Sequence, residues 1–205
     1  KGRHAGLFGV AGSYSFYPAK TLGCFGDGGA VVTNDDEAAT FIRTLRDHGR
    51  DINGEVICWG HNARLDNIQA AILGFKLLTY NEKIRRRREI AILYHSKLKE
   101  IKHILLPPSP EEKSPNFDIF QNYEIQITRR QELQDFLKEN GVGTIIQWGG
   151  WMLHQFKELN LKANAPYAEK MSKQMLLLPM HHMLTDEEVI YICELIKSFF
   201  DKNDG

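Results

Sequence analysis

The hydrophobic pattern of the N-terminal half predicts two short strands and two helices. Residues 7–17 alternate small and apolar side chains, as a strand does, and residues 30–33 form a second apolar run of strand length. Residues 34–47 open with Asn-Asp-Asp-Glu, which favours a helix start, and then repeat apolar residues at helical spacing. After a predicted loop over residues 50–63, a helical stripe of apolar residues covers residues 66–98, and Asp66 is its predicted N-cap. A helix of this length with little internal punctuation often bridges two lobes.

The C-terminal half follows a proline-rich stretch at residues 107–115, which is the clearest boundary signal in the chain. We therefore predict two domains, residues 1–105 and residues 106–205. The pattern of the second domain indicates a compact α+β unit. Its expected strands cover residues 120–127, 142–147 and 175–179, and its expected helices cover residues 130–140, 167–174 and a final helix that Thr185 opens with a capping box.

Composition argues against several classes of function. The chain has 205 residues with 26 Lys+Arg and 26 Asp+Glu, so its formal net charge is zero and no nucleic-acid partner is expected. No apolar run approaches the roughly 20 residues that a membrane span needs, so no membrane partner is expected either. The widely spaced Cys24, Cys58 and Cys193 form neither a disulfide framework nor a metal-ligand spacing, and predict a reducing, cytoplasmic setting without a metal site. The four arginines at residues 85–88 are predicted to form a solvated helix face or an edge that contacts another subunit.

One lysine stands in a setting that suits amine chemistry. Lys20 closes the run Ser15-Phe-Tyr-Pro-Ala-Lys20, and the glycine-rich turn Gly26-Asp-Gly-Gly29 follows it. An amine in such a position can form a Schiff base with an aldehyde cofactor, and the hydroxyl of Ser15 can donate to a phosphate. Glycines in the turn permit close approach of the backbone to a ligand. Together these residues predict a site for pyridoxal phosphate.

Five motifs in the chain resemble those of one family of enzymes. They are Ser15–Lys20, Gly26–Ala30, Leu45–Gly49, Asn62–Asp66 with Ile68–Ala71, and Leu178–His181. In this order and at these spacings they resemble the DegT/DnrJ/EryC1/StrS family of pyridoxal-phosphate-dependent nucleotide-sugar aminotransferases. The resemblance covers nearly the whole chain and corresponds to the C-terminal part of a typical member. Since the chain opens without an initiator methionine, as if within a domain, we expect an upstream segment to lie outside this sequence.

The resemblance implies a fold and a set of roles. The fold would be α/β and aspartate-aminotransferase-like (fold type I of the pyridoxal phosphate enzymes), without the N-terminal part of the large domain and with a small α+β C-terminal domain. Lys20 would form the Schiff base as the catalytic residue, and Ser15 would hold the cofactor phosphate. Asn62 would reach the phosphate of the partner subunit's cofactor, in a homodimer with shared active sites. Arg64 would bind the carboxylate of the amino donor.

The implied reaction moves the amino group of an amino acid, glutamate, to a nucleotide-linked keto-sugar, in the synthesis of cell-surface polysaccharides or amino sugars. Two other functions stay open. A dehydratase relative would use the cofactor to remove water from the sugar, but such relatives carry histidine in place of the lysine, so Lys20 argues against this function. The chain could instead be a non-catalytic fragment that serves only as an assembly or dimerisation module. Many family members carry a His-Tyr pair near Gln147-Trp148, and this departure leaves the sugar, its ring position and the nucleotide unspecified.

Overall fold

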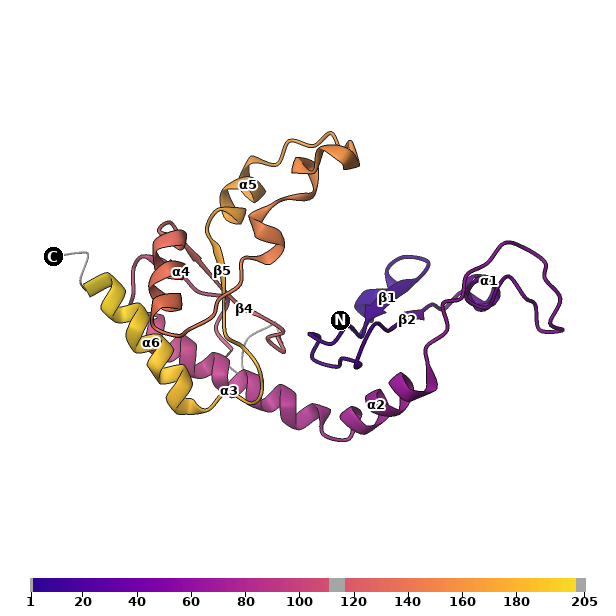
Figure 1. Ribbon diagram of the computed structural model, residues 1–205, viewed down its shortest axis with the longest axis horizontal. Coiled ribbons are helices and arrows are strands. Elements are labelled where there is room, and N and C mark those ends of the chain that lie inside the picture. Colours follow the sequence, from indigo (N-terminus) through magenta and orange to yellow (C-terminus); the bar gives the residue numbers. More distant parts are fainter. Residues whose placement is uncertain (1, 111–116, 202–205) are drawn as a thin grey trace. The chain divides into compact units, whose positions relative to one another are not determined.

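The computed structural model describes residues 2–110 and 117–201 of the chain (Figure 1). Contacts divide the chain into two units, Lys1–Asn81 and Glu82–Gly205. No helix within the described ranges has the length and apolarity needed to cross a lipid bilayer. The domain boundary predicted between residues 105 and 106 from the proline-rich stretch stays a prediction.

The first unit is built around a two-stranded antiparallel sheet. Its elements are the 3-10 turn η1 (Ala5–Leu7), strands β1 (Gly12–Ser15) and β2 (Gly29–Val32), and helices α1 (Asp36–Arg46) and α2 (Asn67–Leu77). The two strands pair so that Ser15 lies opposite Gly29. Of the strand predicted over residues 7–17, four residues are in β1, because η1 and the bends after it turn the chain before the sheet begins.

Helix α1 lies close to its predicted bounds, whereas the long predicted helix is interrupted. The carboxylate of Asp35 accepts the N–H of Ala38 at 2.9 Å and caps the first turn of α1. The stripe predicted over residues 66–98 is divided between α2 and α3 (Tyr80–Leu98), with a short turn between the two helices. Asp66 is the N-cap of α2, but its side chain makes no capping hydrogen bond.

The first unit buries few apolar side chains within itself. Cys24 and Leu73 are the buried hydrophobic residues among its described residues, whereas Val31 on β2 and Phe41 on α1 are 47% and 57% exposed. An isolated two-stranded hairpin is at best marginally stable in water, because it has neither enough strands nor a covering layer. The stability of this unit is therefore expected to be lower than that of the second.

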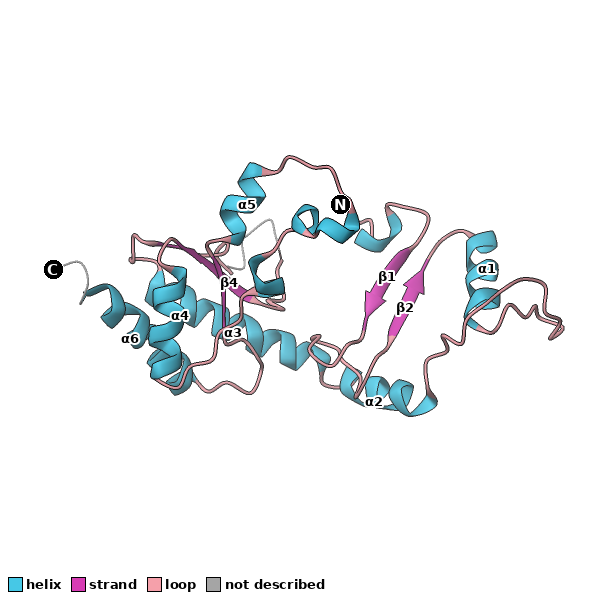
Figure 2. Cartoon of the chain, turned by 45° about the horizontal axis from the view of Figure 1, so that its top comes forward, coloured by secondary structure: helices cyan, strands magenta, loops and turns pink. Residues whose placement is uncertain are grey.

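The second unit has a three-stranded antiparallel sheet covered by helices. Its elements are α3 from Glu82 onward, β3 (Ile104–Leu105), β4 (Tyr123–Ile127), α4 (Arg130–Glu139), the 3-10 turns η2 (Gln147–Gly150), η3 (Leu153–Gln155) and η4 (Lys157–Leu159), α5 (Pro166–Ser172), β5 (Met175–Leu178) and α6 (Asp186–Asp201). The strand order is β3-β4-β5. Figure 2 shows α4 and α6 next to each other, and the two helices are in contact. The predicted capping box is confirmed, since Thr185 N–H donates to the Glu188 carboxylate at 2.9 Å and Glu188 N–H donates to Thr185 Oγ1 at 3.2 Å.

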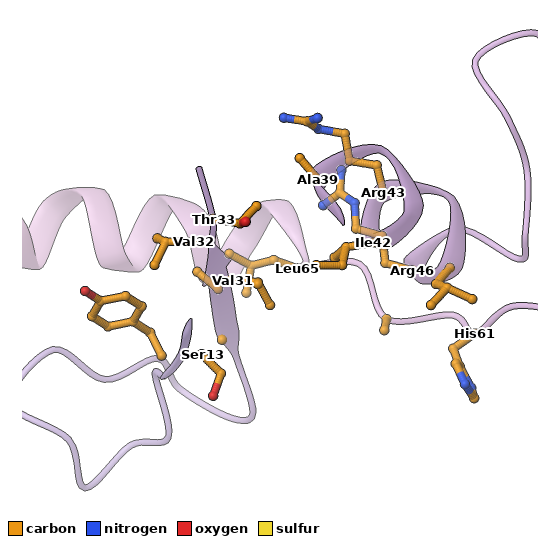
Figure 3. A pocket seen from close by; sticks show the side chains of 15 residues that line it. Ser13, Val31, Val32, Thr33, Ala39, Ile42, Arg43, Arg46, His61 and Leu65 are labelled. Atoms are coloured by element: carbon orange, nitrogen blue, oxygen red, sulfur yellow. The ribbon is translucent and has the colours of Figure 1, made fainter. Parts of the chain in front are cut away.

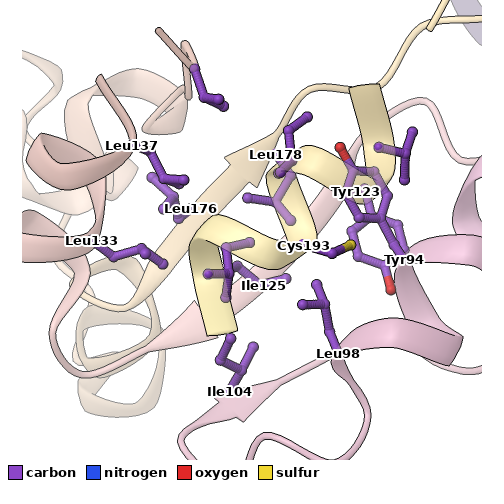
Figure 4. Close-up of a cluster of buried hydrophobic side chains, with 14 of the residues drawn as sticks. Tyr94, Leu98, Ile104, Tyr123, Ile125, Leu133, Leu137, Leu176, Leu178 and Cys193 are labelled. Carbon is purple, nitrogen blue, oxygen red and sulfur yellow. The ribbon is translucent and has the colours of Figure 1, made fainter. Parts of the chain in front are cut away.

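A continuous hydrophobic core holds the second unit together (Figure 4). Its buried members include Tyr94, Leu98, Ile104, Tyr123, Ile125, Leu133, Leu137, Leu176, Leu178 and Cys193. The rings of Tyr94 and Tyr123 stack with their centroids 4.8 Å apart. Burial raises the pKa of the Cys193 thiol to about 12, so this thiol stays protonated and packs as a small apolar side chain.

This difference between the units predicts a difference in hydrogen exchange. We expect the backbone amides of β1 and β2 to exchange at least about 100-fold faster than those of β4, because local opening free energies range from near zero to the global value. Strand β4 is the internal reference, since Tyr123, Ile125 and Ile127 are buried. Hydrogen–deuterium exchange of the native chain with peptide-level mass spectrometry measures both rates. Equal protection would contradict the expectation and show that the first unit has stabilising contacts beyond its own.

Residues 142–147 do not form the predicted strand. The segment contributes one antiparallel bridge, between Ile145 and Leu177, and η2 follows at once. Trp148, Gly149 and Gly150 have φ values of +50°, +65° and +80°, a left-handed run that cannot continue a strand. The apolar pattern was compatible with a strand, but the backbone turns away from the sheet after a single pairing.

The arginine run at residues 85–88 is tied to its own unit. Arg86 forms an ion pair with Asp186 at 2.8 Å. Arg87 is 7% exposed, and its Nη1 lies within hydrogen-bond distance of three carbonyl oxygens. Arg88 donates to a carbonyl oxygen at 2.6 Å. The prediction of a solvated helix face is wrong for these three arginines, because they bind carboxylate or carbonyl groups of segments distant in sequence.

Candidate functional site

Ser15 and Lys20 lie at the end of β1 and in the turn that follows it. The N–H of Lys20 donates to the carbonyl oxygen of Tyr17 at 2.8 Å and closes the turn. The side chain of Lys20 is exposed, and within the described ranges it makes no hydrogen bond or ion pair. The Oγ of Ser15 accepts the N–H of Tyr17 at 3.3 Å, which leaves the hydroxyl hydrogen free to donate to another acceptor. The backbone therefore presents an amine and a hydroxyl donor near one strand end.

The loop between Lys20 and β2 packs closely on itself. A Cβ at Gly23 would lie 2.7 Å from each of two carbonyl oxygens in the preceding turn, so a side chain would collide with backbone there. A Cβ at Gly28 would lie 2.7 Å from the sulfur of the buried Cys24. The N–H of Phe16 donates to the carbonyl oxygen of Gly28 at 2.7 Å and closes the base of the loop. These close approaches fix the backbone around Lys20 while its amine stays exposed.

Asn62 and Arg64 lie on a segment beside the C-terminal end of α1. Two backbone hydrogen bonds, of 2.7 Å and 2.9 Å, run from residues 61–63 to the last turn of that helix. The guanidinium of Arg64 pairs with the carboxylate of Asp47 at 3.0 Å, and its Nε donates to Asn62 Oδ1 at 3.3 Å. Both predicted site residues are exposed, and the amide nitrogen of Asn62 remains available as a donor.

The structure groups the predicted residues into two pairs, Ser15 with Lys20 and Asn62 with Arg64. Within the described part of the chain, no hydrogen bond joins one pair to the other. An amino-acid carboxylate that binds Arg64 would either share this arginine with Asp47 or displace Asp47 from it. The roles of the four residues in binding and catalysis stay predictions.

Two residues of α2 that the sequence analysis did not predict as site residues hold the loop after Lys20. The side-chain amide of Gln69 hydrogen-bonds both backbone groups of Phe25, and Lys76 Nζ donates to the carbonyl oxygen of Gly23. These contacts join positions that are 44 and 53 residues apart in the chain. A helical periodicity shows which side chains share a face of α2, but it does not show which loop that face meets.

A hollow of about 850 Å³ lies in the first unit between β1–β2, α1 and the segment before α2 (Figure 3). Figure 3 shows Val31, Ile42 and Leu65 between the strand and the helix, so much of the lining is apolar. Neither Ser15 nor Lys20 lines this hollow. It is therefore distinct from the site that the amine and hydroxyl donors mark.

Comparison with known proteins places the chain in a family. A family model described as the DegT/DnrJ/EryC1/StrS aminotransferase family matches residues 1–197. The chain belongs to this family. The match confirms the predicted membership, and it indicates pyridoxal phosphate as the cofactor of the DegT/DnrJ/EryC1/StrS aminotransferases. Solved structures of sugar aminotransferases confirm the aspartate-aminotransferase-like fold class.

Individual relatives show how much of such an aminotransferase is present. The chain is 38% identical to the pleiotropic regulatory protein of Geobacillus stearothermophilus, covering 97% of this chain and 54% of that protein. It is 36% identical to a UDP-2-acetamido-2-deoxy-3-oxo-D-glucuronate aminotransferase of Pseudomonas aeruginosa, covering 94% of this chain and 53% of that protein. The crystal structure of a family member from Brucella abortus matches with a TM-score of 0.84 and 34% identity, over 95% of this chain and 52% of that one. The chain thus spans about half the length of the curated relatives it matches.

The donor set of the site fits the cofactor that the family indicates. Pyridoxal phosphate carries an aldehyde, which reacts with an amine, and a phosphate, which needs hydrogen-bond donors. Lys20 supplies an exposed amine, and the hydroxyl of Ser15 and the amide nitrogen of Asn62 are free to donate. The residues present therefore suit both the aldehyde and the phosphate of the cofactor.

Proposed function

We propose that the protein transfers an amino group from glutamate to a nucleotide-linked keto-sugar, with pyridoxal phosphate as cofactor. The observation that carries the proposal is the exposed amine of Lys20 in the turn that directly follows Ser15 and β1, in a chain of an aminotransferase family. Relatives of 36% and 32% identity are named as transaminases of UDP-linked and dTDP-linked sugars, which supports a nucleotide-linked substrate. The products would enter polysaccharide or amino-sugar synthesis, and the setting would be cytoplasmic.

Lys20 would have two tasks in this reaction. Its amine would hold the cofactor through the aldehyde carbon, and after release it would take the proton from the carbon that bears the amino group and return a proton later. When bound, pyridoxal phosphate supplies the electron sink that makes removal of this proton feasible. Because the Lys20 side chain is exposed and free of ion pairs in the described part of the chain, it can move between these tasks without breaking a protein contact.

Ser15 and Asn62 would bind phosphate without adding charge. The hydroxyl of Ser15 is oriented by the Tyr17 N–H that it accepts, so it can donate to a phosphate oxygen at low entropic cost. The oxygen of Asn62 is engaged by Arg64, which directs the amide nitrogen away from that contact. We propose that Asn62 serves the cofactor of a second copy of the chain, in a homodimer with shared active sites, and that Arg64 binds the carboxylate of glutamate.

A second candidate function is a non-catalytic assembly or dimerisation module. The sparse burial in the first unit supports it, because Cys24 and Leu73 are the buried hydrophobic residues of the described part of that unit. A cofactor site with so little core around it depends on further contacts for rigidity. Titration of the chain with pyridoxal phosphate separates the candidates, since a module without catalytic function would show no change in the cofactor absorbance.

Isotope transfer tests the proposed reaction. The protein is incubated with pyridoxal phosphate, ¹⁵N-labelled glutamate and a panel of UDP-linked and dTDP-linked keto-sugars, and the sugars are analysed by mass spectrometry. Appearance of ¹⁵N in an amino sugar with equimolar 2-oxoglutarate is the expected result. Formation of 2-oxoglutarate without labelled sugar would contradict the keto-sugar acceptor, and absence of both would contradict the aminotransferase.

Replacing Ser15 with alanine is expected to weaken binding of the cofactor. A hydrogen bond to a charged group contributes about 1.5–3 kcal/mol, so the Kd for pyridoxal phosphate should rise by roughly 10- to 100-fold. Ser13, which lies on the same strand, provides a matched Ser→Ala control. Spectroscopic titration of both variants measures the change. An unaltered Kd in Ser15→Ala would remove this residue from the phosphate site.

A further inference from the structure

One helical face meets the loop that follows Lys20. Gln69 and Lys76 are two turns apart on one face of α2, and Tyr80 is the first residue of α3, after the short turn that follows α2. Between Gln69 and Lys76 on this face, Leu73 is buried. These residues combine one apolar anchor with three polar side chains, and each polar side chain contacts the segment Thr21–Phe25.

Gln69 makes the most specific of these contacts. Its Oε1 accepts the N–H of Phe25 at 2.9 Å, and its Nε2 donates to the carbonyl oxygen of the same residue at 3.2 Å. The side-chain amide thus pairs with Phe25 as the backbone of a neighbouring strand would. The ring of Phe25 is 74% exposed, so burial of the ring does not fix this residue.

Lys76 and Tyr80 add two further attachment points. Lys76 Nζ donates to the carbonyl oxygen of Gly23 and lies 4.7 Å from the centroid of the Phe25 ring, a cation–π distance. The hydroxyls of Tyr80 and Thr21 are 3.2 Å apart. The loop is consequently attached to α2 and to the first residue of α3 at alternate loop residues, beginning at the residue directly after Lys20.

We propose that Gln69 and Lys76 are positioning residues that hold the backbone of Lys20 in a fixed position relative to Ser15. The inference rests on the proposed function, in which Lys20 carries the cofactor and Ser15 binds its phosphate. Lys20 lies between the end of β1 and the attached segment Thr21–Phe25, so both flanks of this lysine are restrained. Effective catalysis requires the reacting groups in a narrow range of positions, and a displacement of about 1 Å can cost roughly 100-fold in rate.

Two variants of Gln69 test the inference. Gln69→Leu removes both hydrogen bonds at similar volume, whereas Gln69→Glu keeps an acceptor for the Phe25 N–H and loses the donor to its carbonyl. The first readout is the rate at which pyridoxal phosphate with borohydride labels Lys20, by peptide mass spectrometry. The second is the split between kcat and the KM for glutamate in the intact enzyme.

We expect Gln69→Leu to slow labelling of Lys20 by about 10-fold and to lower kcat by roughly 10- to 100-fold, with a KM for glutamate within about twofold of the wild type. Labelling of the exposed Lys99 in the second unit should not change. Gln69→Glu should be intermediate at neutral pH, because the carboxylate keeps the acceptor for the Phe25 N–H and lacks the donor to the Phe25 carbonyl oxygen.

A glutamine elsewhere in the chain provides the matched control. Gln131 on α4 bonds only to Asp135 among described residues, at 3.0 Å, so Gln131→Leu is expected to leave both readouts unchanged. If Gln69→Leu fails to fold, Gln69→Glu and Lys76→Met decide the question. Wild-type rates of Lys20 labelling in folded Gln69 variants would overturn the positioning role alone. A wild-type protein that is not labelled at Lys20 would overturn the proposed function and this inference with it.

Discussion

Replacing Lys20 with alanine is expected to abolish transamination, with a fall in rate of at least about 10⁴-fold, the upper range of what general acid–base catalysis supplies. The proposed reaction uses this one amine both to hold the cofactor and to move the proton at the substrate carbon. Loss of activity should occur without unfolding, because the Lys20 side chain is exposed and makes no hydrogen bond or ion pair within the described residues. The measurements are ¹⁵N transfer from glutamate and the thermal unfolding midpoint of the variant.

Two controls distinguish loss of the covalent link at Lys20 from loss of a positive charge and from removal of any exposed lysine. Lys20→Arg keeps the positive charge but cannot form the covalent link, so it should be as inactive as the alanine variant. Lys99→Ala removes an exposed lysine in the second unit and should keep full activity. Borohydride reduction of the wild type followed by peptide mapping should place the cofactor on Lys20. A label on another lysine, or turnover by either Lys20 variant, would refute the assignment.

Replacing Arg87 with methionine is expected to destabilise the second unit by about 3–5 kcal/mol. Arg87 Nη1 lies 2.9 Å, 3.2 Å and 3.1 Å from the carbonyl oxygens of Phe120, Gln121 and Met180, and methionine would leave these acceptors without that donor. Phe120 has a φ of +51°, an unfavourable conformation for a residue with a side chain, which the surrounding hydrogen bonds maintain. Urea unfolding followed by far-UV circular dichroism measures the change.

Arg85 provides the control for this prediction, because it lies on the same helix and is exposed. Arg85→Met removes the same charge and is expected to change the free energy of unfolding by no more than about 0.5 kcal/mol. Equal effects of the two substitutions on the free energy of unfolding would contradict the prediction, because they would show that the hydrogen bonds of Arg87 add no stability beyond the effect of its charge.

Sequence patterns were most informative where the signal is local. Polar residues indicated the start of α1 within residues 34–37 and that of α6 at Thr185, since a short polar side chain and a free N–H lie within one turn of each other. The pattern failed for residues 142–147, where one bridge and a left-handed run replace the strand. It also failed for three arginines of the run 85–88, because their acceptors are carbonyl and carboxylate groups distant in the chain.

The same distinction holds for the candidate site. The places of Ser15 at a strand end and of Lys20 in the turn after it could be predicted, because the strand, the proline and the glycine-rich turn are contiguous in sequence. The pairing of Arg64 with Asp47 and the attachment of Phe25 to Gln69 could not, because each joins segments that meet only when the first unit folds. A single sequence contains no information about such pairings beyond the compatibility of the side chains.

By itself, the sequence determined the family and its cofactor chemistry, and it predicted Lys20 as the reactive lysine, because these inferences depend on residue types at short, fixed spacings. The tertiary structure alone decided how the backbone around Lys20 is held, because it fixes which face of α2 contacts the loop from Thr21 to Phe25. It also decided that Arg64 pairs with the carboxylate of Asp47. Hydrogen bonds between distant segments depend on how the intervening chain folds, and local propensity does not specify that.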